Sequence, residues 1–315
     1  MSIWATMPIT AKNAEMITRA TRESIEYGSM FDSTNHAKIL EADILLCRDK
    51  EINKALLPAM KNLKWLFNVG AGVDRLPFST LKEHGIRVAN APNISNDAMS
   101  DYAIGAMMMF SCNFIEMIRC QHEHFWKPYV YTQTLKGQTV LIVGAGKIGK
   151  SIALKAKAFG MGVLGIRWHK QQDSDFDYVG GADEIYSLCG KADFIISTLP
   201  ATDKTVGFFD NTVFASMKKT AVFINISRGK VVCVQDLIDS LDNGVIKGAV
   251  VDTFEKEPLP KDDPLWDAKN IVITPHSSGR IEGFVDKALE VFIDNYRAYM
   301  QNGVLLNEIN LDKGY

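Results

Sequence analysis

The sequence lacks the marks of several protein classes. Its five cysteines are odd in number, scattered along 315 residues and form no Cys-x-x-Cys pair, which indicates free thiols in a reducing compartment. The 35 basic residues nearly balance 37 acidic residues, so nothing favours nucleic acid or an anionic membrane surface as a partner. The longest apolar stretch, 103–110, is far shorter than the roughly 20 residues that span a bilayer. The first residues do not resemble a signal peptide, so we expect a cytoplasmic protein with no membrane partner.

What the sequence does contain is typical of a globular chain with two domains. Hydrophobic residues make up 47% and charged residues 23%, and the length suits two cores of about 150 residues each. Several predicted strands are continuous apolar runs, which is typical of strands buried on both faces of a parallel sheet. Helical stretches separate many of them, so the fold class is predicted to be α/β and doubly wound. The predicted strands are 3–7, 43–47, 64–69, 87–90, 139–143, 163–167, 194–198, 221–226, 248–252 and 271–274.

Two long helices are predicted to connect the domains. One runs from about 97 to 125, and the other covers about 281–302 and ends at Gly303, which suits a helix C′ position. The block between them is a self-contained βα series. We therefore expect one domain at 98–281 and a second domain formed by 1–97 plus 282–315.

A glycine-rich turn follows the predicted strand 139–143. The sequence Gly144-Ala145-Gly146-Lys147-Ile148-Gly149 matches G-x-G-x-x-G, which is a weak signal alone. A strand before it and a helix after it make a pyrophosphate site, because glycine lets the backbone approach the phosphates and the helix presents free N–H groups. The alternative is a tight turn without a ligand.

The next predicted strand carries information about the dinucleotide. An NAD site usually presents an acid there to the ribose 2′-hydroxyl, but this strand ends in Arg167, followed by His169 and Lys170. Arginine can pair with a 2′-phosphate, so we expect NADP to be preferred, with NAD possible. The alternative is a solvated basic loop in which Asp173 or Asp175 folds back onto the ribose.

Three side chains follow predicted strands of the central block. Arg228, Glu257 and His276 should therefore meet at the edge where ligands bind in such sheets. An arginine holds a carboxylate, a histidine carries a proton near neutral pH, and a carboxylate stabilises the imidazolium. No metal site is expected, because His122 and His124 cannot share one helix face.

Along nearly its whole length the chain resembles the D-isomer-specific 2-hydroxyacid dehydrogenases. The motifs that carry the resemblance are VGAGVDRL (69–76), GAGKIG (144–149), STLPATDKTVGFF (197–209), INISRGKVV (224–232), VVDTFEKEPLP (250–260) and ITPHSSG (273–279). The resemblance implies a Rossmann cofactor domain inserted in a flavodoxin-like substrate domain. It also implies a homodimer joined through about 98–140.

The same resemblance assigns roles to residues. Arg228 would bind substrate, Glu257 would be the carboxylate partner and His276 the acid–base group. Substrate carboxylate would be held by backbone amides, and further residues would line the nicotinamide site. The amides are those of Ala71, Gly72 and Val73, and the nicotinamide-site residues are Asp252, Thr198, Leu199 and Pro200.

The expected reaction is reversible hydride transfer from NADPH to a small 2-oxo acid. His276 would donate the proton while Arg228 grips the carbonyl and carboxylate. Asn68 stands where relatives acting on phosphoglycerate carry arginine, so a phosphorylated substrate is disfavoured; the substrate side chain stays open. The alternative function is a nucleotide-sensing module like the family's corepressors, which the intact Arg–Glu–His set disfavours.

Overall fold

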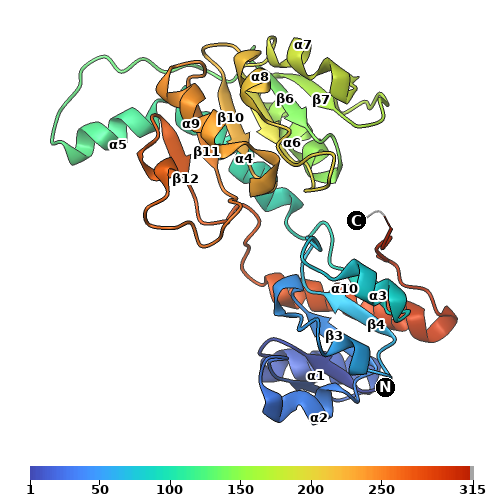
Figure 1. The fold of residues 1–315 in the computed structure, drawn as a ribbon. Helices are drawn as coiled ribbons and strands as arrows, with labels where there is room; N and C mark the ends of the chain where they lie inside the picture. Colours follow the sequence, from blue (N-terminus) through green and yellow to red (C-terminus); the bar gives the residue numbers. More distant parts are fainter. Residues whose placement is uncertain (313–315) are drawn as a thin grey trace. The chain divides into compact units, whose positions relative to one another are not determined.

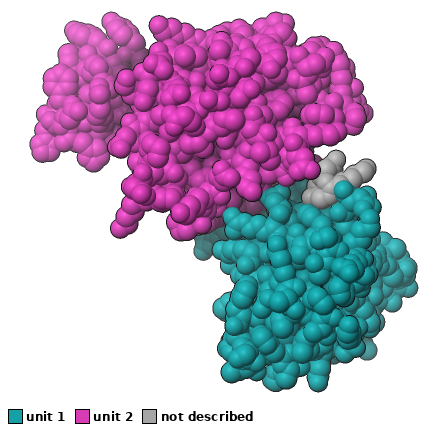
Figure 2. Space-filling view, viewed as in Figure 1, with its two compact units in different colours: residues 1–94, 281–315 teal, residues 95–280 magenta. Residues whose placement is uncertain are grey.

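The computed structural model describes residues 1–312, which form two compact units. Unit 1 is formed by Met1–Ile94 and Ile281–Tyr315, and unit 2 by Ser95–Arg280 (Figure 2). Each unit has its own parallel sheet with helices on both faces. The α/β fold predicted from the apolar runs is therefore confirmed.

The sheet of unit 1 has five parallel strands in the order β2-β1-β3-β4-β5. Its strands β3 and β4 are labelled in Figure 1. This order is that of flavodoxin-like folds, in which ligands lie beyond the carboxyl ends of the strands. Its strands are β1 (Ile3–Ala5), β2 (Ile25–Tyr27), β3 (Ile44–Cys47), β4 (Trp65–Asn68) and β5 (Arg87–Asn90). Its helices are α1 (Ala11–Thr21), α2 (His36–Ile39), α3 (Phe78–Glu83) and α10 (Phe284–Asn302).

Aromatic packing attaches α10 to the sheet of unit 1. The ring of Phe292 lies 5.6 Å from that of Trp65 and 5.4 Å from that of Phe67, and all three side chains are fully buried. The helix begins at Phe284, later than predicted, and ends at Asn302, with Gly303 after it in the left-handed conformation, as predicted. Burial of these large rings holds the C-terminal helix against strands from the first third of the chain.

The sheet of unit 2 has seven parallel strands in the order β12-β11-β10-β9-β6-β7-β8, which is the Rossmann order with one strand added. Its strands are β6 (Thr139–Val143), β7 (Gly162–Ile166), β8 (Tyr178–Gly180), β9 (Phe194–Ser197), β10 (Val222–Asn225), β11 (Gly248–Val251) and β12 (Ile271–Ile273). Its helices are α4 (Asn96–Ser111), α5 (Phe114–His122), α6 (Lys147–Ala158), α7 (Ile185–Cys189), α8 (Asn211–Ala215) and α9 (Val234–Asp242).

Alternate side chains of β10 pack into two different hydrophobic cores of unit 2, one on each face of the sheet. Val222 and Ile224 of β10 pack with α4 and α6 on one face of the sheet. Phe223, between them, packs with α8 and α9 on the other face. Burial on both faces explains why the strand is apolar without alternation.

The structure corrects the single helix predicted over about 97–125. The chain forms α4 and α5, which are bent by 66° at a break around Asn113. Asn113 has a left-handed backbone (φ 54°), which asparagine tolerates better than most residues, and its amide bonds to the carbonyl of Tyr131. Among the described residues no single helix is long and apolar enough to cross a membrane; α4 and α5 reach that length and composition only together.

Candidate active site

A histidine and a glutamate meet at the carboxyl edge of the unit 2 sheet. His276 follows β12 and Glu257 follows β11, and the imidazole Nδ1 lies 2.9 and 3.0 Å from the two carboxylate oxygens. The histidine side chain is 44% exposed, and its Nε2 has no hydrogen-bond partner within residues 1–312. One ring nitrogen is thus held by a carboxylate while the other is free to exchange a proton.

Asp252 holds the loop that carries His276. Its fully buried carboxylate accepts hydrogen bonds from the N–H groups of Ser277 (2.8 Å) and Ser278 (2.9 Å) and from the hydroxyl of Thr274 (2.6 Å). These bonds keep His276 in a left-handed backbone (φ 49°), which costs of the order of 1 kcal/mol for a residue other than glycine. The resemblance assigned Asp252 to the nicotinamide site; its bonds to Thr274, Ser277 and Ser278 were not predicted from the sequence.

Tyr102 of α4 continues this network. Its hydroxyl lies 2.6 Å from that of Thr274, which in turn donates to Asp252. Burial is the largest of the causes that raise the pKa of Tyr102 to about 12, so the phenol stays neutral beside the carboxylate. The chain of bonds connects α4 to the histidine loop, a connection that spacing along the sequence does not reveal.

Arg228 is placed by the loop after β10. Its carbonyl accepts a bond from the amide of Asn225 (3.3 Å), and its guanidinium donates to the carbonyl of Ser227 (2.9 Å). Gly229 follows, where an added Cβ would lie 2.0 Å from the carbonyl carbon of Phe254. Only glycine permits this backbone contact, which brings the arginine loop against the loop that leads to Glu257. The three predicted side chains therefore follow three adjacent strands, β10, β11 and β12.

The glycine turn after β6 is shaped for close approach. Gly144 has φ 109°, and an added Cβ there would lie 2.6 Å from the Thr198 hydroxyl oxygen. A Cβ on Gly149 would lie 2.6 Å from the carbonyl oxygen of Gly144, whereas one on Gly146 would meet nothing within 4 Å. The first and third glycines therefore permit internal packing, and the second leaves the backbone open to a ligand, as a pyrophosphate requires.

The first turn of α6 supplies the donors. Nothing within residues 1–312 accepts a hydrogen bond from the N–H groups of Lys147, Ile148 or Gly149. Such groups at a helix N-terminus favour an anion. Thr198 directly follows β9, next to this turn, and its hydroxyl donates to the carbonyl of Gly144; Leu199 and Pro200 come after it. The residues present therefore fit a dinucleotide.

The tip of β7 carries a charge cluster. Arg167 donates from Nε to the carbonyl of Ala145 (2.6 Å) and from Nη2 to the carboxylate of Asp173 (2.9 Å). Lys150 of α6 lies 2.7 Å from the same carboxylate and is the main cause that lowers the pKa of Asp173 to about 2. Asp173 thus folds onto Arg167, whereas the alternative interpretation places Asp173 or Asp175 on the ribose.

The other two basic residues predicted here are arranged differently. Lys170 donates to Glu184 (2.8 Å) and to the hydroxyl of Tyr178 (2.6 Å), and the Lys170 bond is the main cause that lowers the pKa of Glu184 to about 2. His169 is exposed. Lys170 thus forms an ion pair beside β8, with partners other than those of the Arg167 guanidinium.

In unit 1 the residues 71–73 form a loop after β4. Within residues 1–312 the N–H groups of Ala71, Gly72 and Val73 have no hydrogen-bond partner. The carbonyls on this loop accept bonds from the side-chain amides of Asn68 and Asn90. A row of open backbone donors is suited to an anion.

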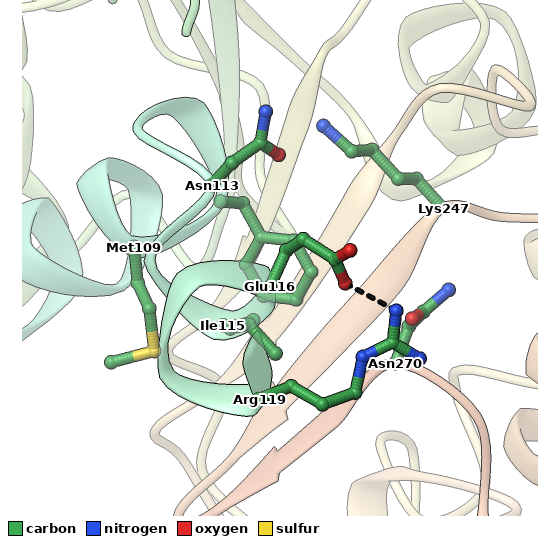
Figure 3. A pocket seen from close by; sticks show the side chains of 8 residues that line it. Met109, Asn113, Ile115, Glu116, Arg119, Lys247 and Asn270 are labelled. Carbon is green, nitrogen blue, oxygen red and sulfur yellow. Dashed lines mark ion pairs between the residues drawn. The ribbon is translucent and has the colours of Figure 1, made fainter. Parts of the chain in front are cut away.

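A separate cavity of about 200 Å³ lies at the other edge of the unit 2 sheet (Figure 3). Lys247 and Asn270, which line it, stand just before β11 and β12, whereas His276 and Glu257 follow these strands. Glu116 and Arg119 of α5 form an ion pair on the opposite wall. The cavity is therefore distinct from the candidate active site. Residues 1–312 contain no group of three or more side chains arranged to hold a metal ion.

The glycine turn, the Rossmann strand order and the His–Glu pair define a dinucleotide-binding α/β protein. A profile described as D-isomer specific 2-hydroxyacid dehydrogenase, NAD binding domain, matches residues 104–278. The chain therefore belongs to the D-isomer specific 2-hydroxyacid dehydrogenase family of NAD(P)-dependent oxidoreductases.

Individual relatives extend the similarity beyond the profile. The chain is 32% identical to the glyoxylate reductase/hydroxypyruvate reductase of Mus musculus, over 88% of both chains. It is 30% identical to the D-3-phosphoglycerate dehydrogenase of Methanocaldococcus jannaschii over 87% of its own length, but spans about half (53%) of that relative. A solved family member from Aeromonas salmonicida superposes with a TM-score of 0.87, at 30% identity and 99% coverage of both chains.

Proposed function

We propose that the protein reduces a small 2-oxo acid to the D-2-hydroxy acid, reversibly, with NADPH as the electron donor. The observation that carries this proposal is the hydrogen bond of 2.9 Å between His276 and Glu257, at the sheet edge that also holds the glycine turn. The similarity to a mammalian glyoxylate reductase/hydroxypyruvate reductase supports a small substrate.

Each side chain has one task in the proposed reaction. The bound dinucleotide supplies hydride in one direction and accepts it in the other. His276 gives its Nε2 proton to the developing alkoxide, and in oxidation the neutral ring takes it back. Glu257 fixes the ring through Nδ1 and stabilises the imidazolium. Arg228 binds the carbonyl oxygen and carboxylate of the substrate, and the amides of Ala71, Gly72 and Val73 bind the carboxylate.

The preference for NADP rests on the charges at the tip of β7. Arg167 and Lys150 already converge on one anion, the carboxylate of Asp173. A ribose 2′-phosphate is an anion with more acceptor oxygens and would compete for the same two cations. In the proposed complex it replaces Asp173 as the partner of Arg167.

The assembly we propose is a homodimer joined through α5 and the loop after it. This arm projects from the sheet of unit 2 (Figure 1) and exposes large apolar side chains. Trp126 is 90% exposed, Tyr129 84% and Tyr131 81%, which is an unusual density of exposed aromatic surface for one segment. Light scattering on the purified protein tests the proposal: a mass near 70 kDa, twice the chain mass of 35.0 kDa, supports it and a mass near 35 kDa contradicts it.

The experiment that tests the activity is the consumption of NADPH and NADH, measured side by side with glyoxylate, hydroxypyruvate, pyruvate and a branched 2-oxo acid. Turnover with a preference for NADPH supports the whole proposal. Turnover with a preference for NADH contradicts the role of Arg167 and keeps the catalytic residues. No turnover despite tight nucleotide binding contradicts the enzymatic proposal and favours the sensing module.

A further inference from the structure

We propose that Asn68 and Asn90 are positioning residues that hold the loop of residues 70–73 open as a carboxylate-binding site. The inference deepens the proposed function, since the carboxylate is that of the 2-oxo acid. Asn68 ends β4, Asn90 ends β5, and the two are direct partners in the register of these parallel strands. Their side chains therefore leave the same face of the sheet, beside the loop that follows β4.

The two side-chain amides bind three consecutive carbonyls. Asn68 donates to the carbonyls of Gly70 (3.0 Å) and Gly72 (2.7 Å), and Asn90 donates to the carbonyl between them, that of Ala71 (2.8 Å). The carbonyl of Gly70 accepts a further bond from the N–H of Ala91 (3.2 Å). Every peptide oxygen of this stretch is thus bonded to the ends of β4 and β5 or to the residue that follows.

The direction of the carbonyls determines the direction of the amides. In a planar trans peptide, the C=O of one residue and the N–H of the next point in opposite directions. The bonded carbonyls of Gly70, Ala71 and Gly72 therefore turn the N–H groups of the residues after each of them away from the asparagines. These are the N–H groups of Ala71, Gly72 and Val73, which have no partner within the described chain.

Asn68 keeps one side-chain atom unpaired while the other holds the loop. Asn68 is 1% exposed, and its Oδ1 is buried with no hydrogen-bond partner in residues 1–312. Reversing the amide would direct its oxygen at two carbonyl oxygens, so the bonds define its orientation. An unpaired buried acceptor is unfavourable. The Asn68 side chain has this cost at Oδ1, while its Nδ2 makes the two hydrogen bonds that orient the loop. By holding the carbonyls, the Asn68 side chain keeps the backbone N–H groups of the loop pointing toward a ligand.

The test compares Asn68→Leu and Asn90→Ser with the wild type. Leucine has the same branched set of four side-chain heavy atoms as asparagine and lacks its donors, and serine is too short to reach the Ala71 carbonyl. We expect each variant to raise KM for glyoxylate and the Kd for oxalate, an unreactive dicarboxylate, by about tenfold, with kcat changed less than about threefold. NADPH affinity should not change, because the glycine turn belongs to unit 2.

A matched control is Asn295→Ser in α10. Asn295 is also fully buried in unit 1 and accepts bonds from the N–H groups of Leu306 (2.9 Å) and Asn307 (3.3 Å). Asn307 in turn accepts from the backbone N–H of Asn90 (3.3 Å), but within residues 1–312 Asn295 has no hydrogen bond to the 70–73 loop. It should lower Tm and leave KM unchanged. If the Asn68 and Asn90 variants behave like this control, or if KM does not change in either, the positioning role is wrong.

The proposed function can fail separately from this inference. Absence of turnover in the wild type contradicts the enzymatic proposal, and calorimetric titration with oxalate then still reports on the loop. Oxalate binding that both Asn variants weaken supports the inference even then. Oxalate that binds wild type and variants equally contradicts it.

Discussion

Within residues 1–312, each unit presents a row of backbone N–H groups without a hydrogen-bond partner, but the two rows are formed differently. In unit 2 the row is the first turn of α6, preceded by a turn in which Gly146 leaves the backbone open to a ligand. In unit 1 the row is an irregular loop, and two buried asparagines hold its carbonyls. A helix orients its own amides through regular hydrogen bonds, whereas a loop needs side chains to do so. The backbone anion site of unit 2 can therefore be recognised from the spacing of glycines in the sequence. That of unit 1 depends on tertiary contacts and cannot.

The largest loss of activity should come from a substitution at His276, which leaves both rows of backbone amides intact. His276→Ala removes the proton carrier, so kcat should fall by about 10³-fold. The Kd values for NADPH and oxalate should stay close to those of the wild type. Steady-state kinetics and fluorescence titration measure these quantities. His84→Ala, at an exposed histidine of unit 1 that bonds only to a backbone carbonyl, is the control and should retain full activity. Near-normal turnover of the His276 variant would refute the mechanism.

A second substitution, Gly144→Ala, should disturb only the row of N–H groups in unit 2. Gly144→Ala places a Cβ 2.6 Å from the Thr198 hydroxyl and 3.0 Å from its carbonyl carbon, at φ 109°. The turn must deform, and we expect the Kd for NADPH to rise about 100-fold while oxalate binding is unchanged. Gly105→Ala in α4 is the control, because an added Cβ meets nothing within 4 Å. It should raise stability by up to about 1 kcal/mol. Equal NADPH binding by the Gly144 variant would contradict the proposed phosphate site.

A third change concerns the charge beside the glycine turn. Asp173→Asn frees Arg167 and Lys150 from their carboxylate, so the ratio of kcat/KM for NADPH over NADH should rise about tenfold. Asp175→Asn is the matched control, because Asp175 lies farther from Lys150, at 4.0 Å, and should leave the ratio unchanged. A ratio that falls in the Asp173 variant would show that this carboxylate does not oppose NADP.

The lowered pKa of Asp173 predicts how the cofactor ratio and the folding stability respond to pH. Since it is lowered from 3.8 to about 2, the carboxylate is ionised throughout the neutral range and its effect on the cofactor ratio should be constant between about pH 5 and 9. Its contribution to folding stability is fully present above the unfolded value and is lost as the pH falls toward 2. Stability measured by urea titration at descending pH should therefore decline less steeply in Asp173→Asn.

The smallest effect is expected at Lys170. Its ammonium is already bound by Glu184 and by the hydroxyl of Tyr178, and the Glu184 bond is the main cause that raises the pKa of Lys170. We expect Lys170→Met to change the Kd for NADPH less than about twofold, whereas Arg167→Met should weaken it at least about tenfold. Similar losses in both variants would show that the 2′-phosphate site extends to β8.

Most of the architecture could be predicted because buried parallel strands have a clear pattern. The run Val222–Asn225 is apolar at successive positions since both faces of β10 are covered. The edge strands β2 and β8 were not predicted: each has only three residues, and two of the three in β2 are exposed. The break at Asn113 was missed as well, since one left-handed residue within a helical pattern leaves little trace in the sequence.

For the candidate site, position after a strand was the useful signal. Arg228, Glu257 and His276 could be grouped because parallel strands bring their carboxyl ends to one edge. The bonds made by Asp252 could not be predicted, because its partners Thr274, Ser277 and Ser278 lie on another strand and its loop. Asn68 likewise gave no sign of binding carbonyls in its own loop.

The sequence by itself determined the class of fold, the glycine turn and the proton-carrying residue types, because apolar periodicity, glycine spacing and side-chain chemistry are local properties. Only the tertiary structure decided that Asp173 accepts a hydrogen bond from Arg167 and that Asp252 holds the histidine loop. The same is true of Asn68 and Asn90, whose side chains orient the backbone of residues 70–73. These are hydrogen bonds of directional side chains to loops. Their partners are set by how neighbouring strands are aligned, and alignment exists only once the sheets have formed.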